Sequence, residues 1–597
     1  MKAIKAINIR KAGYMAAVLI GAASFSSCVD MDLAPTNEPS EESVWSSPTL
    51  AVQAANGIYN EFTYTYRESS NCMWQPFSAC VDRDANWTDF NHTYARVTTT
   101  DGYVNGRWGS FYKAALRANS VIDGLAGVPG MDEAQRQKLT CEAKFIRAWA
   151  YYMLNVLYHG VPYIKEAISS PADANMPRET MDQVWDDIIK DLNDCIGCPN
   201  FPDKYPQGSS QWGHVTKSCA YALRGKVYMW KKEWHNAELD FRAVERCGHK
   251  LYTADGPESF KTLLTQPNED CDEMIYSICY SPDVTYGNGL HRAFAPRSVY
   301  GGEGWTNFVI NPWFVDLFEN ADGSRFNWDD VIPGYNQMST QARRVYFLRD
   351  NLTADEIAAQ AAAGADMSKY LPQGNEARIY KAYENRDPRL NMSVITPYHK
   401  FLGGVRNVAE EFTWRFPFHS DGELDLRTDI SAMAYYVGRK FVLEGIQTPY
   451  HYSYCDVPVI RFGEVVLHLA ECLNEQGDYN GAAEQINRLR ARAGAALLNS
   501  NEATKVKGVD DMRERIIREM YYEIGLEDDV YFEELRHHVW RQNKFYVDHN
   551  GQMNGMRQVW GTPTYKYIDG GETYYSWPIP EQEVQNNPAM TQSPEWM

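Results

Sequence analysis

Residues 221–244 contain the pattern that most restricts how this chain can fold. They are predicted to form two short helices joined by a tight turn. Gly225 lies where the two helices must approach closely, and Tyr228 follows one turn later. Ala237 and Phe241 repeat this spacing of a small and a large residue on the second helix. This alternation is typical of a tetratricopeptide hairpin.

The same spacing returns near the other end of the chain, at residues 467–489. Ala470, Leu473, Ala482 and Ile486 keep the intervals of the first hairpin. A single match could come from any amphipathic helical hairpin, but two matched hairpins favour a repeat architecture. The predicted fold class is therefore mainly α, with tetratricopeptide-like helical hairpins forming a right-handed superhelical scaffold. Such a scaffold is a platform for binding and carries no chemistry of its own.

Charge and composition restrict the kinds of partner. The chain has 597 residues and a formal net charge of -20, which disfavours nucleic acid because phosphates would be repelled. Aromatic residues make up 13% of the chain, with 39 Tyr and 17 Trp. Tyr and Trp combine an apolar face with a polar edge, which suits contacts with sugars or other proteins. Most of them are nevertheless expected in the core.

The first residues are predicted to be a secretory signal rather than part of the fold. A basic start is followed by an apolar run from Tyr14 to Phe25 that is too short to span a bilayer. Small residues then precede Cys28, so residues 1–27 resemble a bacterial lipoprotein signal peptide whose lipidated residue would be Cys28. Simple secretion is the alternative. Residues 28–48 are polar and predict a flexible tether behind the lipid anchor.

The remaining residues, 49–597, are predicted to form one body because no Ser/Gly linker separates its parts. Helical repeats are expected at about 107–247 and about 460–543. Between them, at about 250–460, Gly, Pro, Asn and aromatic residues interrupt almost every possible helix. Only residues 353–364, which are rich in Ala, are predicted to be helical there. A long irregular insert of this kind usually has a functional reason.

Two motifs suggest bound metal or redox chemistry only weakly. Cys195-Ile-Gly-Cys198 is a single C-x-x-C without a second pair at zinc spacing, so a local disulfide or two buried thiols are expected. Asp421-Gly-Glu423-Leu-Asp425 could offer oxygen ligands to calcium, but it lacks the spacing of an EF-hand loop. No cofactor is predicted, and a structural calcium ion is the one alternative left open.

The sequence predicts no enzyme. It contains no H-E-x-x-H, no G-x-S-x-G and no P-loop. A glycosidase needs two carboxylates about 5–10 Å apart across a sugar bond, whereas sequence neighbours such as Asp528 and Asp529 usually point apart. His537 and His538 lie on a charged predicted helix, where solvation is a better interpretation than metal binding.

Several features together resemble the SusD/RagB family. They are the lipoprotein signal, the helical hairpins on both sides of an irregular insert, the Arg-Asp-Pro-Arg motif at 386–389, and Trp-Pro-Ile-Pro at 577–580. The similarity covers the chain from about residue 32 to residue 596. The segment 523–540 departs from the run common in the family, but it is predicted to be helical and structural. The Asp-Pro step at 387–388 is likewise interpreted as a turn. The arginines of the motif can hold this turn in place by pairing with neighbouring carboxylates.

The resemblance implies a lipid-anchored, surface-exposed protein of the outer membrane that binds a nutrient glycan without catalysis. It also implies a partner, a TonB-dependent transporter of the SusC type, to which the oligosaccharide is delivered. Capture of peptides by the same architecture, as in RagB-like branches, is the alternative.

Two loop stretches, 74–94 and 280–305, could hold the ligand. A sugar stacks its C–H face on an aromatic ring while polar side chains bind its hydroxyls, and such residues collect on loops. Glycines in the second stretch would let the backbone approach a ligand. Packing in the core is the alternative for each aromatic residue. The predicted ligand-binding residues are Trp74, Asp82, Arg83, Asn86, Trp87, Tyr286, Arg292 and Trp305.

Overall fold

A computed structural model describes most of the chain after the predicted signal and tether. The described residues are 41–60, 74–83, 91–168, 170–281, 287–299, 304–405, 408–419, 424–427, 435–447, 453–545, 559–560 and 567–597. Cys28 and residues 1–27 lie outside them, so the signal peptide and the lipid anchor stay predictions.

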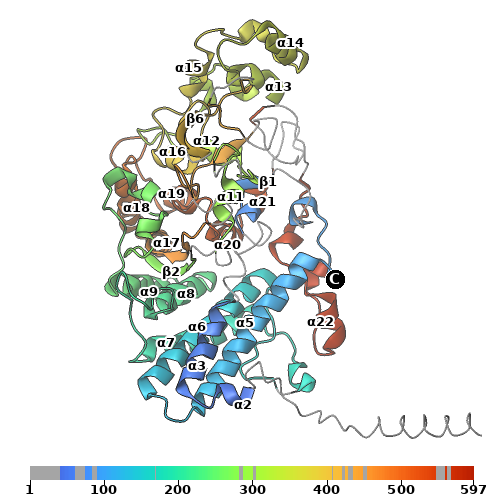
Figure 1. Cartoon of the computed structure of the whole chain (residues 1–597), viewed down its shortest axis with the longest axis vertical. Helices are drawn as coiled ribbons and strands as arrows, with labels where there is room; N and C mark the ends of the chain where they lie inside the picture. The colour runs from blue at the N-terminus through green and yellow to red at the C-terminus, as the bar shows by residue number, and fades with distance from the viewer. Residues whose placement is uncertain are drawn as a thin grey trace, which may run out of the picture.

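Long helices form the first part of the body (Figure 1), as predicted. Sequence neighbours pack against each other, α5 on α6, α6 on α7 and α7 on α8. The helices of this part are α2 (Glu41–Val44), α3 (Pro48–Asn56), α5 (Gly102–Ala126), α6 (Glu133–Tyr158), α7 (Met181–Gly197), α8 (Lys217–Trp230) and α9 (Trp234–Arg246).

Polar side chains fix where these helices begin. The Asp101 carboxylate accepts hydrogen bonds from two backbone N–H groups in the first turn of α5, and Asp132 accepts one at the start of α6. At the start of α7, Thr180 and Gln183 form a reciprocal capping box. Each cap satisfies backbone donors that have no partner inside the helix and contributes about 1 kcal/mol.

The first predicted hairpin is present as α8 and α9. A Cβ added to Gly225 would lie only 2.6 Å from the ring of Phe241, so glycine alone permits this approach of the two helices. Ala237 and Phe241 are both buried in the contact. The packing that the sequence pattern predicts is therefore the packing observed.

The second hairpin consists of α17 (Phe462–Glu475) and α18 (Tyr479–Ala493). Ala470, Ala482 and Ile486 are completely buried between them. α17 also packs against α9, so the two hairpins lie side by side although more than 200 residues separate them in sequence. The fold is thus mainly helical, as predicted, while the right-handed superhelical path stays a prediction.

The insert between the hairpins has more regular structure than predicted. The expected helix at 353–364 is present as α14 (Ala354–Ala362). The other α-helices described in this region are α10 (Ser259–Thr262), α11 (Leu290–Phe294), α12 (Pro312–Leu317), α13 (Thr340–Arg343), α15 (Asn375–Tyr380) and α16 (Arg389–Ser393). Its strands are β2 (Met274–Ile278), β3 (Phe308–Ile310), β4 (Val394–Ile395), β5 (Lys400–Val405), β6 (Val408–Thr413), β7 (Tyr436–Gly438) and β8 (Val457–Arg461).

Strand pairing organises the insert. An earlier strand, β1 (Val81–Arg83), joins a four-stranded sheet of order β1-β3-β7-β4, and β5 and β6 form a hairpin. β2, near the start of the insert, pairs antiparallel with β8 at its end. The two ends of the insert are therefore joined by backbone pairing, while the single body stays a prediction.

Buried charges reinforce the β2–β8 junction. The Arg461 guanidinium lies 2.9 Å from the carboxylate of Glu273 and 2.6 Å from that of Glu523, and none of these side chains is more than 2% exposed. Arg492 of α18 also pairs with Glu273, at 3.1 Å. Removing one partner from such a network would leave a buried charge uncompensated.

The Arg-Asp-Pro-Arg turn is structural, as predicted. Arg389 is fully buried and pairs with Asp387 at 2.8 Å and with Glu519 at 2.5 Å. Arg386 donates hydrogen bonds to the carbonyls of Val315 and Ala382. Both arginines therefore fix the turn within the core, and neither is available to a ligand.

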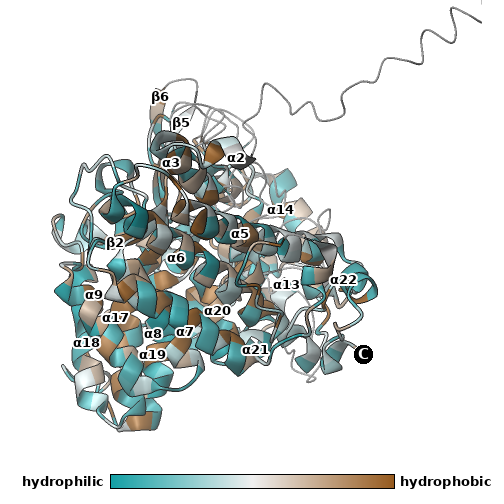
Figure 2. Cartoon of the chain, turned by 90° about the horizontal axis from the view of Figure 1, so that it is seen from below, coloured by the Kyte–Doolittle hydropathy of each residue, from teal (hydrophilic) through white to brown (hydrophobic). Residues whose placement is uncertain are grey.

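The last helices follow the second hairpin, and the first of them packs against α17 and α18. They are α19 (Val509–Ile524), α20 (Asp529–Arg536), α21 (Trp540–Lys544) and α22 (Glu581–Asn586). Hydrophilic and hydrophobic residues alternate on helices such as α7 and α8 (Figure 2), as expected of helices that cover a core. Among the described residues, no helix combines the length and the apolar character needed to cross a membrane.

Candidate functional site

The first predicted ligand stretch reaches the four-stranded sheet through β1, and the second ends at Trp305, shortly before β3 begins at Phe308. β1 is antiparallel to β3, with Val81 opposite Ile310 and Arg83 opposite Phe308. Because the strands run in opposite directions, Arg83 at the end of β1 and Phe308 at the start of β3 lie at the same end of this pair. Stretches more than 200 residues apart in sequence are thus brought together.

Arg292 and Trp305 form the centre of the candidate site. The Arg292 guanidinium lies over the indole of Trp305, with its central carbon 3.8 Å from the ring centroid. The backbone N–H of Trp305 also donates to the Arg292 carbonyl at 3.0 Å. Both side chains are half-buried. A guanidinium stacked on an indole offers hydrogen-bond donors beside an apolar face, which is the combination that a sugar requires.

The backbone around Trp305 is tightly constrained. A Cβ on Gly304 would lie 2.7 Å from the Ala295 carbonyl, so this position requires glycine. Thr306 has a φ of 52°, which is rare for a β-branched residue. Its N–H donates to the Ala295 carbonyl at 2.9 Å. Strained backbone of this kind persists where surrounding structure enforces it, and here it fixes the position of the indole.

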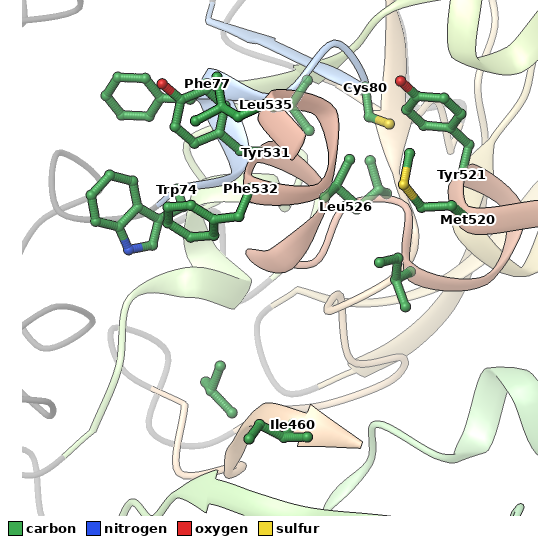
Figure 3. Close-up of a cluster of buried hydrophobic side chains, with 14 of the residues drawn as sticks. Trp74, Phe77, Cys80, Ile460, Met520, Tyr521, Leu526, Tyr531, Phe532 and Leu535 are labelled. Carbon is green, nitrogen blue, oxygen red and sulfur yellow. The ribbon is translucent and has the colours of Figure 1, made fainter. Parts of the chain in front are cut away.

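Trp74 lies in the core, which corrects the prediction that it binds a ligand. Its side chain is 4% exposed and contacts aromatic residues of α20 (Figure 3), where its ring centroid lies 5.1 Å from that of Phe532. The ring also lies 5.8 Å from Trp577. Trp74 borders a cavity of about 60 Å³, which has room for a few water molecules but not for a sugar ring.

Asp82 is also buried, which corrects a second prediction. It has no exposed surface, and its carboxylate lies 3.2 Å from the ammonium of Lys544 at the end of α21. A hydroxyl group of a ligand could reach this carboxylate only after the ion pair had opened. Lys544 was not predicted from sequence, because nothing near it in the chain distinguishes it from a solvated lysine.

Three predicted residues, Asn86, Trp87 and Tyr286, lie outside the described residues and stay predictions. Arg83 is described as part of β1, where its backbone pairs with Phe308. His291, next to Arg292, is 3% exposed, and burial lowers its pKa to about 3, so it is a neutral core residue.

Of the three carboxylates in the predicted calcium loop, only that of Asp425 is among the described residues. Its carboxylate lies 2.9 Å from the guanidinium of Arg415 and accepts a hydrogen bond from the backbone N–H of His419 at 2.6 Å. A calcium ion would have to displace these donors. Asp421 and Glu423 lie outside the described residues.

Two buried clusters in the described part of the chain carry enough ligand atoms to be considered for a metal. They are Glu464–His468–Asp529 and Glu471–Glu533–His537. Each already contains a cation, Lys226 at 2.8 Å from Glu464 and Arg536 at 2.6 Å from Glu471. The His537 side chain is only 11% exposed, so its predicted solvation is wrong, whereas the His538 side chain is 63% exposed.

A cavity of about 400 Å³ lies beside α10 and was not predicted. Its walls include Phe260, Phe441 and Tyr454. Phe441 stacks on Phe294 of α11 with ring centroids 6.3 Å apart. The lining segments are distant in sequence, so no local pattern could have identified the cavity. Its size suits a small ligand, and it is a second place where one could bind.

These features define a class of protein: a helical scaffold with a candidate site of aromatic and polar side chains, and without a catalytic constellation among the described residues. Two family models match the chain. One, described as SusD family, matches residues 272–596, and one, described as starch-binding associating with outer membrane, matches residues 31–229. The chain belongs to the SusD family. Members of this family are non-catalytic binding proteins, so the protein is not an enzyme.

Relatives and solved structures agree with this assignment. SusD-like protein P25 of Formosa agariphila is 21% identical over 510 residues, which cover 84% of this chain and 81% of the relative. The crystal structure of a SusD-like protein from Bacteroides fragilis has a TM-score of 0.69 at 22% identity and covers 94% of this chain and 99% of its own. A SusD-like carbohydrate-binding protein from the same species also reaches 0.69, at 19% identity, with coverage of 92% and 100%. The fold is thus that of SusD-like proteins.

Proposed function

We propose that this protein binds a glycan at the sheet edge where β1 meets β3, with Trp305 as the stacking platform and Arg292 as the polar contact. The observation that carries the proposal is the stacking of Arg292 on Trp305 at 3.8 Å, next to the end of β1. The other predicted contacts, Asn86, Trp87 and Tyr286, lie outside the described residues and belong to the proposal only as predictions from sequence.

A carbohydrate is favoured as ligand for two reasons. An indole and a guanidinium combine an apolar face with polar N–H groups, and both side chains are only half-buried, which suits a ligand with many hydroxyls. A solved relative of the same fold is described as carbohydrate-binding, and one matching family model is described as starch-binding. Peptide capture by the same site is the alternative.

The wider setting of the proposal comes from the N-terminal signal and the family. Lipidation of Cys28 would anchor the protein to the outer membrane, with residues 28–48 as tether. A SusC-like TonB-dependent transporter would receive the oligosaccharide. The helical hairpins would provide a right-handed superhelical support for this transfer.

Binding to a panel of oligosaccharides, with a peptide panel beside it, tests the proposal. Calorimetry with the wild type should give saturable binding of a glycan, and Trp305→Ala should weaken it at least about tenfold, or 1.4 kcal/mol. Trp234→Ala, which removes a half-buried indole at the start of α9, is the matched control and should leave affinity unchanged.

A third variant distinguishes the two possible locations. Tyr454→Ala alters the 400 Å³ cavity without touching Trp305. If Tyr454→Ala abolishes binding while Trp305→Ala does not, the site is the cavity and the proposed location is wrong. A saturable peptide signal without any glycan signal would replace the proposed ligand class.

A further inference from the structure

The cavity of about 400 Å³ beside α10 has walls from segments that are far apart in sequence. One wall comes from α10 and the turn after it, within residues 260–267, and the other from residues 439–447. Met392 of α16 and Tyr454 complete the lining. The volume lies within the range of cavities that bind small organic molecules.

Two buried aromatic rings make the wall apolar. Phe260 and Phe441 are 4% and 6% exposed. Two cations hold the Phe260 ring, with the Lys440 ammonium 5.1 Å and the Arg492 guanidinium carbon 5.2 Å from its centroid. Phe441 has a φ of 65°, which is rare for a bulky residue, and its ring stacks on Phe294. These contacts fix both rings, so the wall is preformed for an apolar ring or chain.

The charged side chains of the lining leave an excess of positive charge. The Glu444 carboxylate lies 2.6 Å from the Arg439 guanidinium and 3.1 Å from the Lys261 ammonium. Two cations therefore share one carboxylate. Lys440, the remaining charged side chain of the described lining, is already paired with Glu527 at 2.6 Å. One positive charge thus has no counterpart among the described residues that line the cavity.

Arg439 also carries a buried donor without an acceptor. Two of its guanidinium nitrogens donate to the Glu444 carboxylate at 2.6 Å and to the Lys400 carbonyl at 2.7 Å. Its Nε–H is buried and has no acceptor among the described residues. Such groups are uncommon in native proteins and unfavourable when left unpaired. A ligand that brings an acceptor would bind this group well, and an anionic acceptor would bind it best.

We propose that this cavity binds a small organic anion, whose apolar ring or chain lies against Phe260 and Phe441 and whose anionic group pairs with Arg439. A neutral sugar suits these apolar walls less well, because its hydroxyls would lose their hydrogen bonds to water there. The proposal does not depend on the glycan site at Arg292 and Trp305. It assigns the cavity a ligand class of its own.

Two fluorescent probes that differ in one charged group test the proposal. Anilinonaphthalene sulfonate combines an aromatic body with an anionic sulfonate, and phenylnaphthylamine is the same body without the sulfonate. Both probes gain fluorescence when they leave water. Titration of the wild type should show saturable binding of each, and the sulfonate should bind at least about tenfold more tightly, which corresponds to about 1.4 kcal/mol.

Two variants test the location and the anion contact. Leu264→Trp places a large side chain in the cavity wall and should abolish saturable binding of both probes. Arg439→Gln should remove the preference for the sulfonate while phenylnaphthylamine binds as before. Since Arg439→Gln also removes a buried ion pair, Lys261→Gln provides a second charge variant. The Lys261 side chain is 32% exposed, and its loss should reduce the same preference without disturbing the fold.

Matched controls separate this site from other attractions. Lys250→Gln removes a cation that is 72% exposed and lies outside the cavity lining, so the affinity for both probes should stay unchanged. Trp305→Ala should also leave probe binding unchanged even where it weakens a glycan. Failure of the glycan proposal and failure of this one are therefore distinguishable.

Three results would overturn the proposal. Probe binding that survives Leu264→Trp would locate the probes elsewhere on the protein. Equal affinities of the two probes for the wild type, or no saturable binding of either, would show that the cavity has no site for an anion. A loss of the sulfonate preference in Lys250→Gln as large as that in Lys261→Gln would reduce the effect to general surface charge.

Discussion

The ammonium of Lys544 lies 3.2 Å from the carboxylate of Asp82, and neither side chain has any exposed surface. The same ammonium lies within hydrogen-bonding distance of three backbone carbonyls, at 3.0 Å from Pro76, 2.9 Å from Ser78 and 2.6 Å from Val81. One buried cation on α21 therefore fixes the segment that leads into β1. Since β1 pairs with β3, it also supports the edge that carries the candidate site.

Replacement of this cation should destabilise the protein strongly. Lys544→Met leaves the Asp82 carboxylate buried without its partner, so the free energy of unfolding should fall by about 3–5 kcal/mol. Urea unfolding followed by circular dichroism measures the change. Lys400→Met removes the exposed pair with Glu411, in which both side chains are at least 60% exposed, and should cost under about 1 kcal/mol. Equal effects of the two variants would contradict the structural role of Lys544.

The close approach of α8 and α9 predicts opposite effects of the same substitution at two glycines. Gly225→Ala places a methyl group 2.6 Å from the Phe241 ring and should lower the free energy of unfolding by about 1–3 kcal/mol. Gly109→Ala, in α5, meets no atom within 4 Å and should raise it by up to about 1 kcal/mol through helix propensity. Thermal unfolding of both variants checks the signs, and a stabilising Gly225→Ala would refute the predicted contact.

The buried carboxyl group of Glu534 should make the free energy of unfolding fall as pH rises. Burial raises the pKa of its carboxyl to about 8, although the backbone N–H of Ala79 and the hydroxyl of Tyr521 donate to it. In the unfolded chain the same group titrates near 4.3. Between these values the folded state binds one more proton than the unfolded state, so stability falls as pH rises.

The Glu534 contribution should therefore be complete below about pH 4.3 and be lost as pH rises through about 8. Glu534→Gln mimics the neutral group and should reduce the loss of stability between pH 6.5 and 8 by about 1 kcal/mol per pH unit. Urea unfolding at several pH values gives the slopes. Parallel slopes for the variant and the wild type would show that Glu534 ionises normally.

Replacement of Arg386 by lysine should lower the free energy of unfolding. The Arg386 guanidinium donates to the carbonyls of Phe318 at 3.1 Å, Ala382 at 2.9 Å and Val315 at 3.0 Å. A lysine ammonium cannot meet acceptors in this planar arrangement, so Arg386→Lys should cost about 2–4 kcal/mol.

The matched control is Arg325→Lys, which alters an exposed pair with Glu514. The two side chains of this pair are 72% and 68% exposed, so Arg325→Lys should lower the free energy of unfolding by less than about 0.5 kcal/mol. Chemical unfolding compares both variants, and a neutral Arg386→Lys would mean that the carbonyls find other donors.

The sequence by itself determined the local parts of this protein. The hairpin at 221–244 could be predicted because Gly225 and Phe241 contact each other from two helices that are adjacent in the chain. The helix at 353–364 and the structural turn at 386–389 were predictable for the same reason, since propensity and turn chemistry act over a few residues. The candidate pair Arg292 and Trp305 was found because both lie in one stretch whose sequence lacks long helical periodicity, although Arg292 is on the short helix α11.

The tertiary structure alone decided which aromatic and charged residues of the predicted site are accessible. Trp74 and Trp305 look equivalent in sequence, but α20, some 450 residues away, covers Trp74, whereas the loop backbone holds Trp305 half-exposed. Asp82 is neutralised by Lys544, 462 residues away. Burial depends on the sum of long-range contacts, and those contacts are set by strand pairing and helix packing that leave no local signal in the chain.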